Sequence, residues 1–221
     1  MSKQFTGKSL PKFLSPAFPK DAPPELITAV ENAALNALDR HGVSAFAAPR
    51  EAAIAHEASH AIVGTHEGLR IRQISIYSQA MPSFGVIWGG RCMEADATWR
   101  TGPDTSAEED LRRARFIVAG LAGEAVTKLD KPGSSLDELA LSQTVGLNAA
   151  MKLADPMLSD TGRGAYAKQL WNERVWGVAI AILFHNREPF MQLAGYLDEH
   201  ERVKGGKLRE VLAQVKRIAA S

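Results

Sequence analysis

The sequence has one cysteine, almost no net charge and no long apolar run, and each absence excludes a class of protein. Cys92 is the only cysteine, so no disulfide can form within the chain and a reducing compartment is indicated. The 26 Lys and Arg residues balance 25 Asp and Glu residues, which gives no electrostatic reason to expect nucleic acid or an anionic membrane as a partner. The most apolar stretch, residues 175–184, is far shorter than the roughly 20 residues of a membrane helix. We therefore expect a soluble, cytoplasmic protein.

Prolines are concentrated at the N-terminus and divide the chain into two parts. Five of the 11 prolines lie in residues 1–24, which we interpret as a Pro-rich extension, with residues 25–221 forming one domain. Hydrophobic periodicity and turn residues predict helices over residues 25–40, 49–64, 104–128, 135–153, 164–186, 187–200 and 206–219, and strands over residues 70–78 and 84–88. Gly89-Gly90 is expected to end the second strand. The expected fold is mainly α with a small β-sheet, in the α+β class.

The strongest signal is the sequence His56-Glu57-Ala58-Ser59-His60, within the second of these helices. Residues four apart on a helix lie on one face, so both imidazoles can bind a single Zn²⁺ ion. Zinc lowers the pKa of a bound water toward about 7, and Glu57 beside that face can remove its proton. Burying these groups in an apolar helix without such a task would be costly. The motif therefore predicts a zinc site with His56 and His60 as ligands and Glu57 as the catalytic base.

A catalytic zinc ion usually has three protein ligands, and the residues alone leave three candidates for the third. His66 follows His60 at the metzincin spacing HExxHxxGxxH, but Val63 stands where that motif has its turning glycine. Glu124 lies in a small-residue stretch of a helix and could bind the metal or support a ligand. Asp137 falls in the first turn of a helix, where acidic residues are common for electrostatic reasons. Spacing does not choose among the three.

Several segments resemble one known family. Residues 55–64, AHEASHAIVG, are similar to the HEAGHA segment of the FtsH-type zinc proteases. Residues 71–78 and 84–86 resemble the two strands that follow it, residues 117–125 resemble the helix usually written LGGRAAEE, and residues 133–139, GSSLDEL, resemble the GASNDL segment. The likeness covers residues 50–212. Three positions depart from the family pattern: Ser59 replaces Gly, Glu124 replaces Arg and Thr127 replaces Glu.

This resemblance implies a zincin-like helical peptidase domain, with the HExxH helix beside a short β meander. It also implies that Asp137, at the position of the family's third zinc ligand, completes the site with His56 and His60. The implied function is an ATP-independent zinc metalloendopeptidase, which hydrolyses flexible or unfolded protein or peptide segments with a zinc-activated water. The family's ATPase module and membrane helices have no counterpart in this sequence, so a separate ATPase or regulatory partner is compatible with it, as is a homo-oligomer.

Two other functions stay open at this point. The first is a non-catalytic regulatory or interaction module that binds zinc within a peptidase fold, for which a fourth protein ligand would be the evidence. The second is a metzincin-like peptidase that uses His66, which requires the helix to end before that residue.

Overall fold

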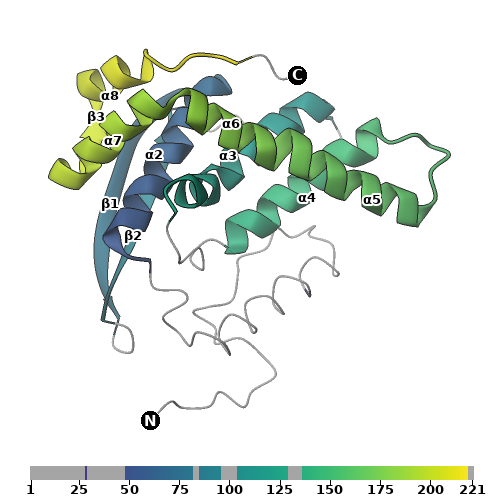
Figure 1. Ribbon diagram of the computed structural model, residues 1–221, viewed down its shortest axis with the longest axis horizontal. Coiled ribbons are helices and arrows are strands. Elements are labelled where there is room, and N and C mark those ends of the chain that lie inside the picture. The colour runs from purple at the N-terminus through teal and green to yellow at the C-terminus, as the bar shows by residue number, and fades with distance from the viewer. Residues whose placement is uncertain (1–27, 29–47, 82–84, 96–103, 129–135, 219–221) are drawn as a thin grey trace, which may run out of the picture.

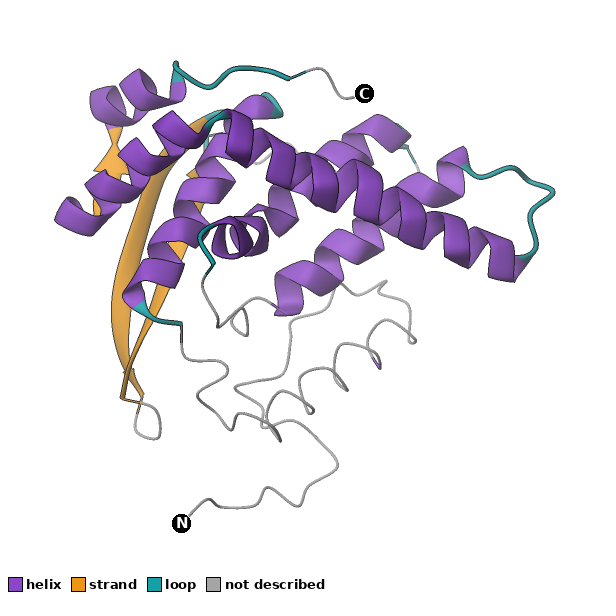
Figure 2. Cartoon of the chain, in the orientation of Figure 1, coloured by secondary structure: helices purple, strands orange, loops and turns teal. Residues whose placement is uncertain are grey.

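The computed structural model describes residues 28, 48–81, 85–95, 104–128 and 136–218. The structure is mainly helical (68%) with a small three-stranded antiparallel sheet, so the expected α+β class is confirmed (Figure 1; Figure 2). The predicted N-terminal extension, and all but one residue of the helix expected over residues 25–40, lie outside the described residues.

Two long helices form the centre of the molecule. Helix α2 (Arg50–His66) is rich in alanine and is buried from Ala52 to Gly64. Helix α3 (Ala107–Val126) begins at Ser106, whose hydroxyl accepts a hydrogen bond from the Glu109 N–H while the Glu109 carboxylate accepts one from Ser106. This reciprocal capping fixes the first turn of α3. Helix α2 packs against the sheet and also against α3 (Figure 1). Both neighbours border the HExxH motif, with β2 against Glu57 and α3 against His56.

The sheet has the order β2-β1-β3. Strands β1 (Ile71–Met81) and β2 (Gly85–Glu94) form an antiparallel hairpin, and the short strand β3 (Arg202–Lys204) pairs with the other edge of β1. The prediction that Gly89-Gly90 would end the second strand was wrong. The strand continues because both glycines give room to a neighbour: the Tyr77 ring lies against Gly89, and the Glu57 side chain lies against Gly90. Strand β3 was not predicted, since three residues are too few to show the alternation of apolar and polar residues that indicates a strand.

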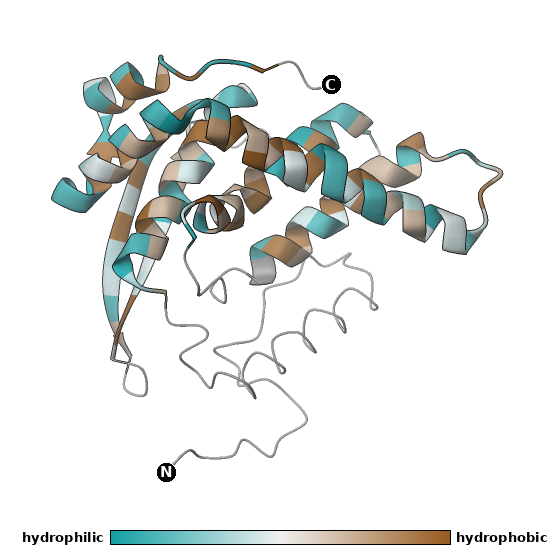
Figure 3. Cartoon of the chain, in the orientation of Figure 1, coloured by the Kyte–Doolittle hydropathy of each residue, from teal (hydrophilic) through white to brown (hydrophobic). Residues whose placement is uncertain are grey.

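The remaining helices form two groups, one packed beside α3 and the other packed on α2 and the sheet. They are α4 (Leu136–Leu153), α5 (Asp160–Leu170), the π-helical turn η4 (Trp171–Trp176), α6 (Gly177–His185), α7 (Arg187–His200) and α8 (Gly205–Leu212). Helices α5, η4 and α6 run on continuously as the one helix expected over residues 164–186, which starts earlier, at Asp160. Helix α6 is largely hydrophobic (Figure 3) and packs against α3. Among the described helices, none combines the length and hydrophobicity needed to cross a bilayer.

Candidate metal centre

Helix α2 carries the three residues of the HExxH motif into the interior. The exposed fractions of His56, Glu57 and His60 are 8%, 5% and 6%. One turn of helix separates the two histidines, and their Nε2 atoms lie 3.1 Å apart. The sequence-predicted pairing of these imidazoles on one helix face is therefore present in the structure.

Glycines on the neighbouring elements make room for the motif. A Cβ atom at Gly120 of α3 would come closer than 3.0 Å to the His56 ring, and one at Gly90 of β2 would come equally close to the Glu57 side chain. A Cβ atom at Gly123 would collide with Ser59 and would lie 2.7 Å from the backbone oxygen of Ala55. The small residues of α3 thus permit the close approach of α2 and α3 that encloses His56.

The second nitrogen of each histidine is held by an acceptor. His56 Nδ1 donates to Glu124 Oε1 at 2.8 Å, and His60 Nδ1 donates to the backbone oxygen of Phe116 at 2.9 Å. These bonds place the proton of each neutral ring on Nδ1 and leave Nε2 with its lone pair. A carboxylate or carbonyl behind each histidine is the usual support of a metal-binding imidazole.

The carboxylate of Glu138 is the third group, and it lies beside the Nε2 atoms of the two histidines. Its oxygens lie 3.1 Å from His56 Nε2 and 3.3 Å from His60 Nε2. His56, His60 and Glu138 could hold a metal ion, since ligand atoms from all three lie within 4.8 Å of one another. Two nitrogens bound to one tetrahedral zinc at 2.0–2.1 Å would be about 3.3 Å apart, close to the observed spacing.

Positive charge stabilises this cluster. Burial by itself raises the pKa of the Glu138 carboxyl, but His60 and His56 outweigh burial and hold that pKa well below its usual value. Burial lowers the pKa of His56, but the carboxylates of Glu138 and Glu124 outweigh it and raise that pKa well above 6.5. The facing Nε2 atoms and the carboxylate therefore need a cation between them, either a proton or a metal ion.

Glu57 lies beside this group with a different environment. Burial raises the pKa of its carboxyl, an effect that His60 and His56 oppose and Glu138 reinforces. Its Oε2 atom is buried and has no hydrogen-bond partner within the described part of the chain. A buried carboxylate oxygen without a partner is costly, and its position next to the histidines offers an acceptor for a proton from a water in the site.

The three residues predicted as candidates for the third metal ligand do not all lie at the two histidines' Nε2 atoms, and the side chain of one of them is not described. Helix α2 runs through His66, whose Nδ1 contacts Glu67 at 3.3 Å and whose Nε2 accepts from the Ile218 N–H at 3.0 Å. Glu124 supports His56 from behind, one of its two anticipated roles. Asp137 lies in the first turn of α4, but its side chain is outside the described residues, so its role as a ligand stays a prediction.

Sequence reasoning did not single out Glu138, although it directly follows Asp137 in the segment that resembles GASNDL. Two adjacent acids at the start of a helix were the available signal.

No protein-family model matches the chain, and no curated protein matches it either.

Proposed function

We propose that this protein is an ATP-independent zinc metalloendopeptidase, with zinc held by His56, His60 and Glu138 and with Glu57 as the catalytic base. The observation that carries the proposal is the convergence of two Nε2 atoms and a carboxylate, with both Nδ1 atoms already engaged. Nitrogen and carboxylate ligands in this number suit a catalytic zinc, which keeps one position open.

A zinc ion held there would activate a water and polarise the carbonyl of a peptide bond. Glu57 would accept the water's proton on Oε2, which has no partner among the described residues, and deliver it to the leaving amine. Glu124 and the Phe116 carbonyl would keep both imidazoles in the tautomer that presents Nε2 to the metal.

An extended substrate segment fits the surroundings of this site. Among the described strands, β2 is the outer one on its side of the sheet, and Gly90 lies against Glu57. The backbone oxygen of Ala48 meets the outer edge of β2 at Trp88, whose N–H it accepts from at 3.1 Å. A peptide in extended form could pair with the outer edge of β2 beyond Trp88 and bring its backbone to the metal centre. Flexible or unfolded chains adopt this extended form readily, and they are therefore the proposed substrates.

The test combines metal analysis with cleavage of an unfolded protein such as casein. The wild-type protein should bind one zinc ion per chain and cleave casein. The Glu57→Gln variant should keep the zinc ion and lose cleavage by at least about 100-fold, the low end for removal of a general base. Glu188→Gln is the matched control, since Glu188 is an exposed residue of the first turn of α7, and it should cleave like the wild type.

Two results would refute the proposal in different ways. A protein that holds zinc but cleaves nothing, in wild-type or variant form, would have a metal-binding module without catalysis. Cleavage by Glu57→Gln at the wild-type rate would remove Glu57 from the mechanism.

A further inference from the structure

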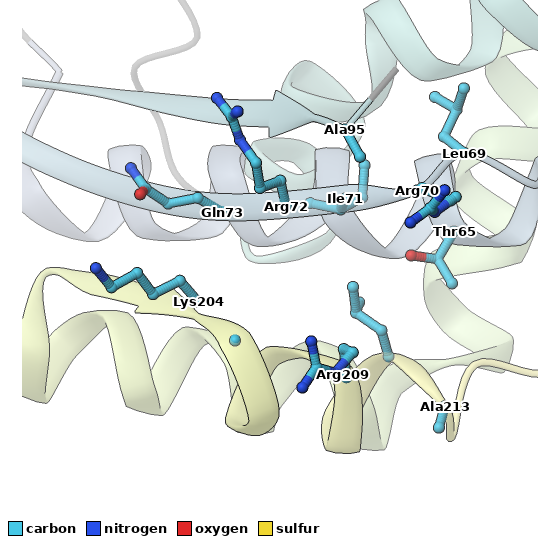
Figure 4. Close-up of a pocket in the computed structure, with 12 residues that line it drawn as sticks. Thr65, Leu69, Arg70, Ile71, Arg72, Gln73, Ala95, Lys204, Arg209 and Ala213 are labelled. Atoms are coloured by element: carbon cyan, nitrogen blue, oxygen red, sulfur yellow. The ribbon is translucent and has the colours of Figure 1, made fainter.

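A cavity of about 740 Å³ lies between the start of β1 and helix α8, away from the metal centre (Figure 4). It is lined by 12 residues, none of which is His56, Glu57, His60 or Glu138. Helix α2 contributes only Thr65, from its C-terminal end. The cavity has the volume of a small-molecule site, for which 300–1,000 Å³ is typical.

The cavity arises from the path that the chain takes after β3. Strand β3 pairs with β1 only at Gln73, Ile74 and Ser75. Immediately afterwards Gly205 adopts a positive φ of 65°, and the chain turns into α8 instead of continuing along the sheet. Within the described residues, β1 before Gln73 therefore faces α8 across the cavity and has no strand beside it on this edge.

The described part of the lining is cationic. Four of its residues are basic, namely Arg70, Arg72, Lys204 and Arg209, and no Asp or Glu is among the described lining residues. The Arg72 guanidinium is turned away from α8 and contacts Met93 of β2. In Figure 4 the side chains of Arg70 and Arg209 lie on opposite sides of the cavity; Arg70 directly precedes β1, and Arg209 belongs to α8. Both residues are solvent-exposed. Positive groups that converge in a concave site raise the local concentration of anions.

The rest of the lining is mainly apolar. Leu69 and Ile71 come from the β1 side, and Leu212 and Ala213 come from the end of α8. A hydrophobic wall with a few convergent charged groups is the usual composition of a site for an organic ligand. A flat lipid surface or a nucleic acid backbone would use the charges but not the concave apolar wall.

We propose that this cavity binds a small organic phosphate. The phosphate group lies between Arg70 and Arg209, and the organic part packs on Leu69, Ile71 and Leu212. Guanidinium groups pair with phosphate oxygens through two parallel hydrogen bonds. Two guanidinium groups also match the multiple charge of a phosphate better than the single charge of a carboxylate.

The test is titration calorimetry on the full-length protein with three probes: ADP, adenosine and inorganic pyrophosphate. ADP should bind at one site per chain. Adenosine lacks the charge and pyrophosphate lacks the organic part, so each should bind at least about tenfold more weakly, as expected when one set of contacts is lost. The variants Arg70→Gln and Arg209→Gln should each weaken ADP binding about tenfold or more, because each removes a charged hydrogen-bonding partner. Arg187→Gln, an exposed arginine of α7 outside the cavity, is the matched control and should bind ADP like the wild type.

A second comparison separates this site from the metal centre, where a phosphate could coordinate a bound ion. The His60→Ala variant should bind ADP with unchanged affinity. The proposal is overturned if ADP does not bind, if pyrophosphate binds as tightly as ADP, or if His60→Ala loses ADP binding while Arg209→Gln keeps it. It is also overturned if the two arginine variants lose binding only to vesicles of phosphatidylcholine and phosphatidylserine, since the basic residues would then serve a membrane surface. Circular dichroism of each variant shows that a loss of binding is not a loss of fold.

Discussion

Gly120 in α3 is the position at which a single methyl group should disturb the metal centre most. A Cβ atom there would lie closer than 3.0 Å to three atoms of the His56 ring, whereas nonbonded carbon atoms pack at about 3.5–4.0 Å. The Gly120→Ala variant must therefore displace the ring, or separate α3 from α2, by roughly 1 Å.

Two effects of this substitution oppose each other in the stability of the fold. Overpacking in a close-packed interior costs about 1–3 kcal/mol, and replacing glycine by alanine within a helix recovers about 1 kcal/mol. The free energy of unfolding should therefore fall by only about 0–2 kcal/mol. Metal affinity should fall more, because the 2.8 Å hydrogen bond from His56 to Glu124 and the 3.1 Å spacing of the two Nε2 atoms both depend on the ring position. Loss of such support typically weakens metal binding about 10–100-fold.

Competition with a chromogenic chelator measures zinc affinity, and urea unfolding measures stability. Gly195→Ala is the matched control, since Gly195 is also a helical glycine but a Cβ atom there meets nothing within 4 Å. This control should bind zinc like the wild type and gain about 0.5–1 kcal/mol of stability. Wild-type zinc affinity in Gly120→Ala would refute the reasoning, because the metal would then be held without the ring position seen in the structure.

Two further predictions concern carboxylates. Glu138→Gln should weaken zinc binding more than Asp137→Asn does, because the Glu138 oxygens face both histidines; the reverse order in the chelator assay would make Asp137 the ligand. Glu67→Gln should destabilise the fold by about 3 kcal/mol at neutral pH, since it leaves the buried Arg115 without its main partner. Burial raises the pKa of Glu67, but hydrogen bonds from His66 and Arg115 outweigh burial and lower that pKa from 4.5. The carboxylate's contribution is therefore complete above the unfolded pKa and is lost as the pH falls through the folded pKa. The difference between wild type and variant in urea unfolding should shrink below about pH 4, and a difference independent of pH would contradict this account.

The sequence predicted well those helices and strands that are specified by their own residues. The HExxH helix was expected at residues 49–64 and is Arg50–His66, because alanine-rich apolar sequence after a proline is sufficient to specify it. Strand β2 was predicted too short because a glycine pair usually breaks a strand. The interactions that let it continue, with Tyr77 and Glu57, come from other parts of the chain.

The third carboxylate shows where prediction from sequence reaches its limit. Asp137 and Glu138 are adjacent on α4, so their side chains point about 100° apart around the helix axis. Which of them faces the histidines depends on the rotation of α4 relative to α2, and the distance between the two segments along the chain contains no information about that rotation. The same holds for Glu124, whose role behind His56 follows from the close packing of α2 and α3.

The sequence by itself determined that two histidines and a glutamate share one helix, because a spacing of four residues is a property of the α-helix alone. It also determined the α+β class, through its hydrophobic periods. The tertiary structure decided what surrounds the histidines: glycines that admit the rings, acceptors that orient them and the carboxylate of Glu138 that faces them. These contacts join residues far apart in the chain, and only the packing of α2 against α3, α4 and the sheet brings them together.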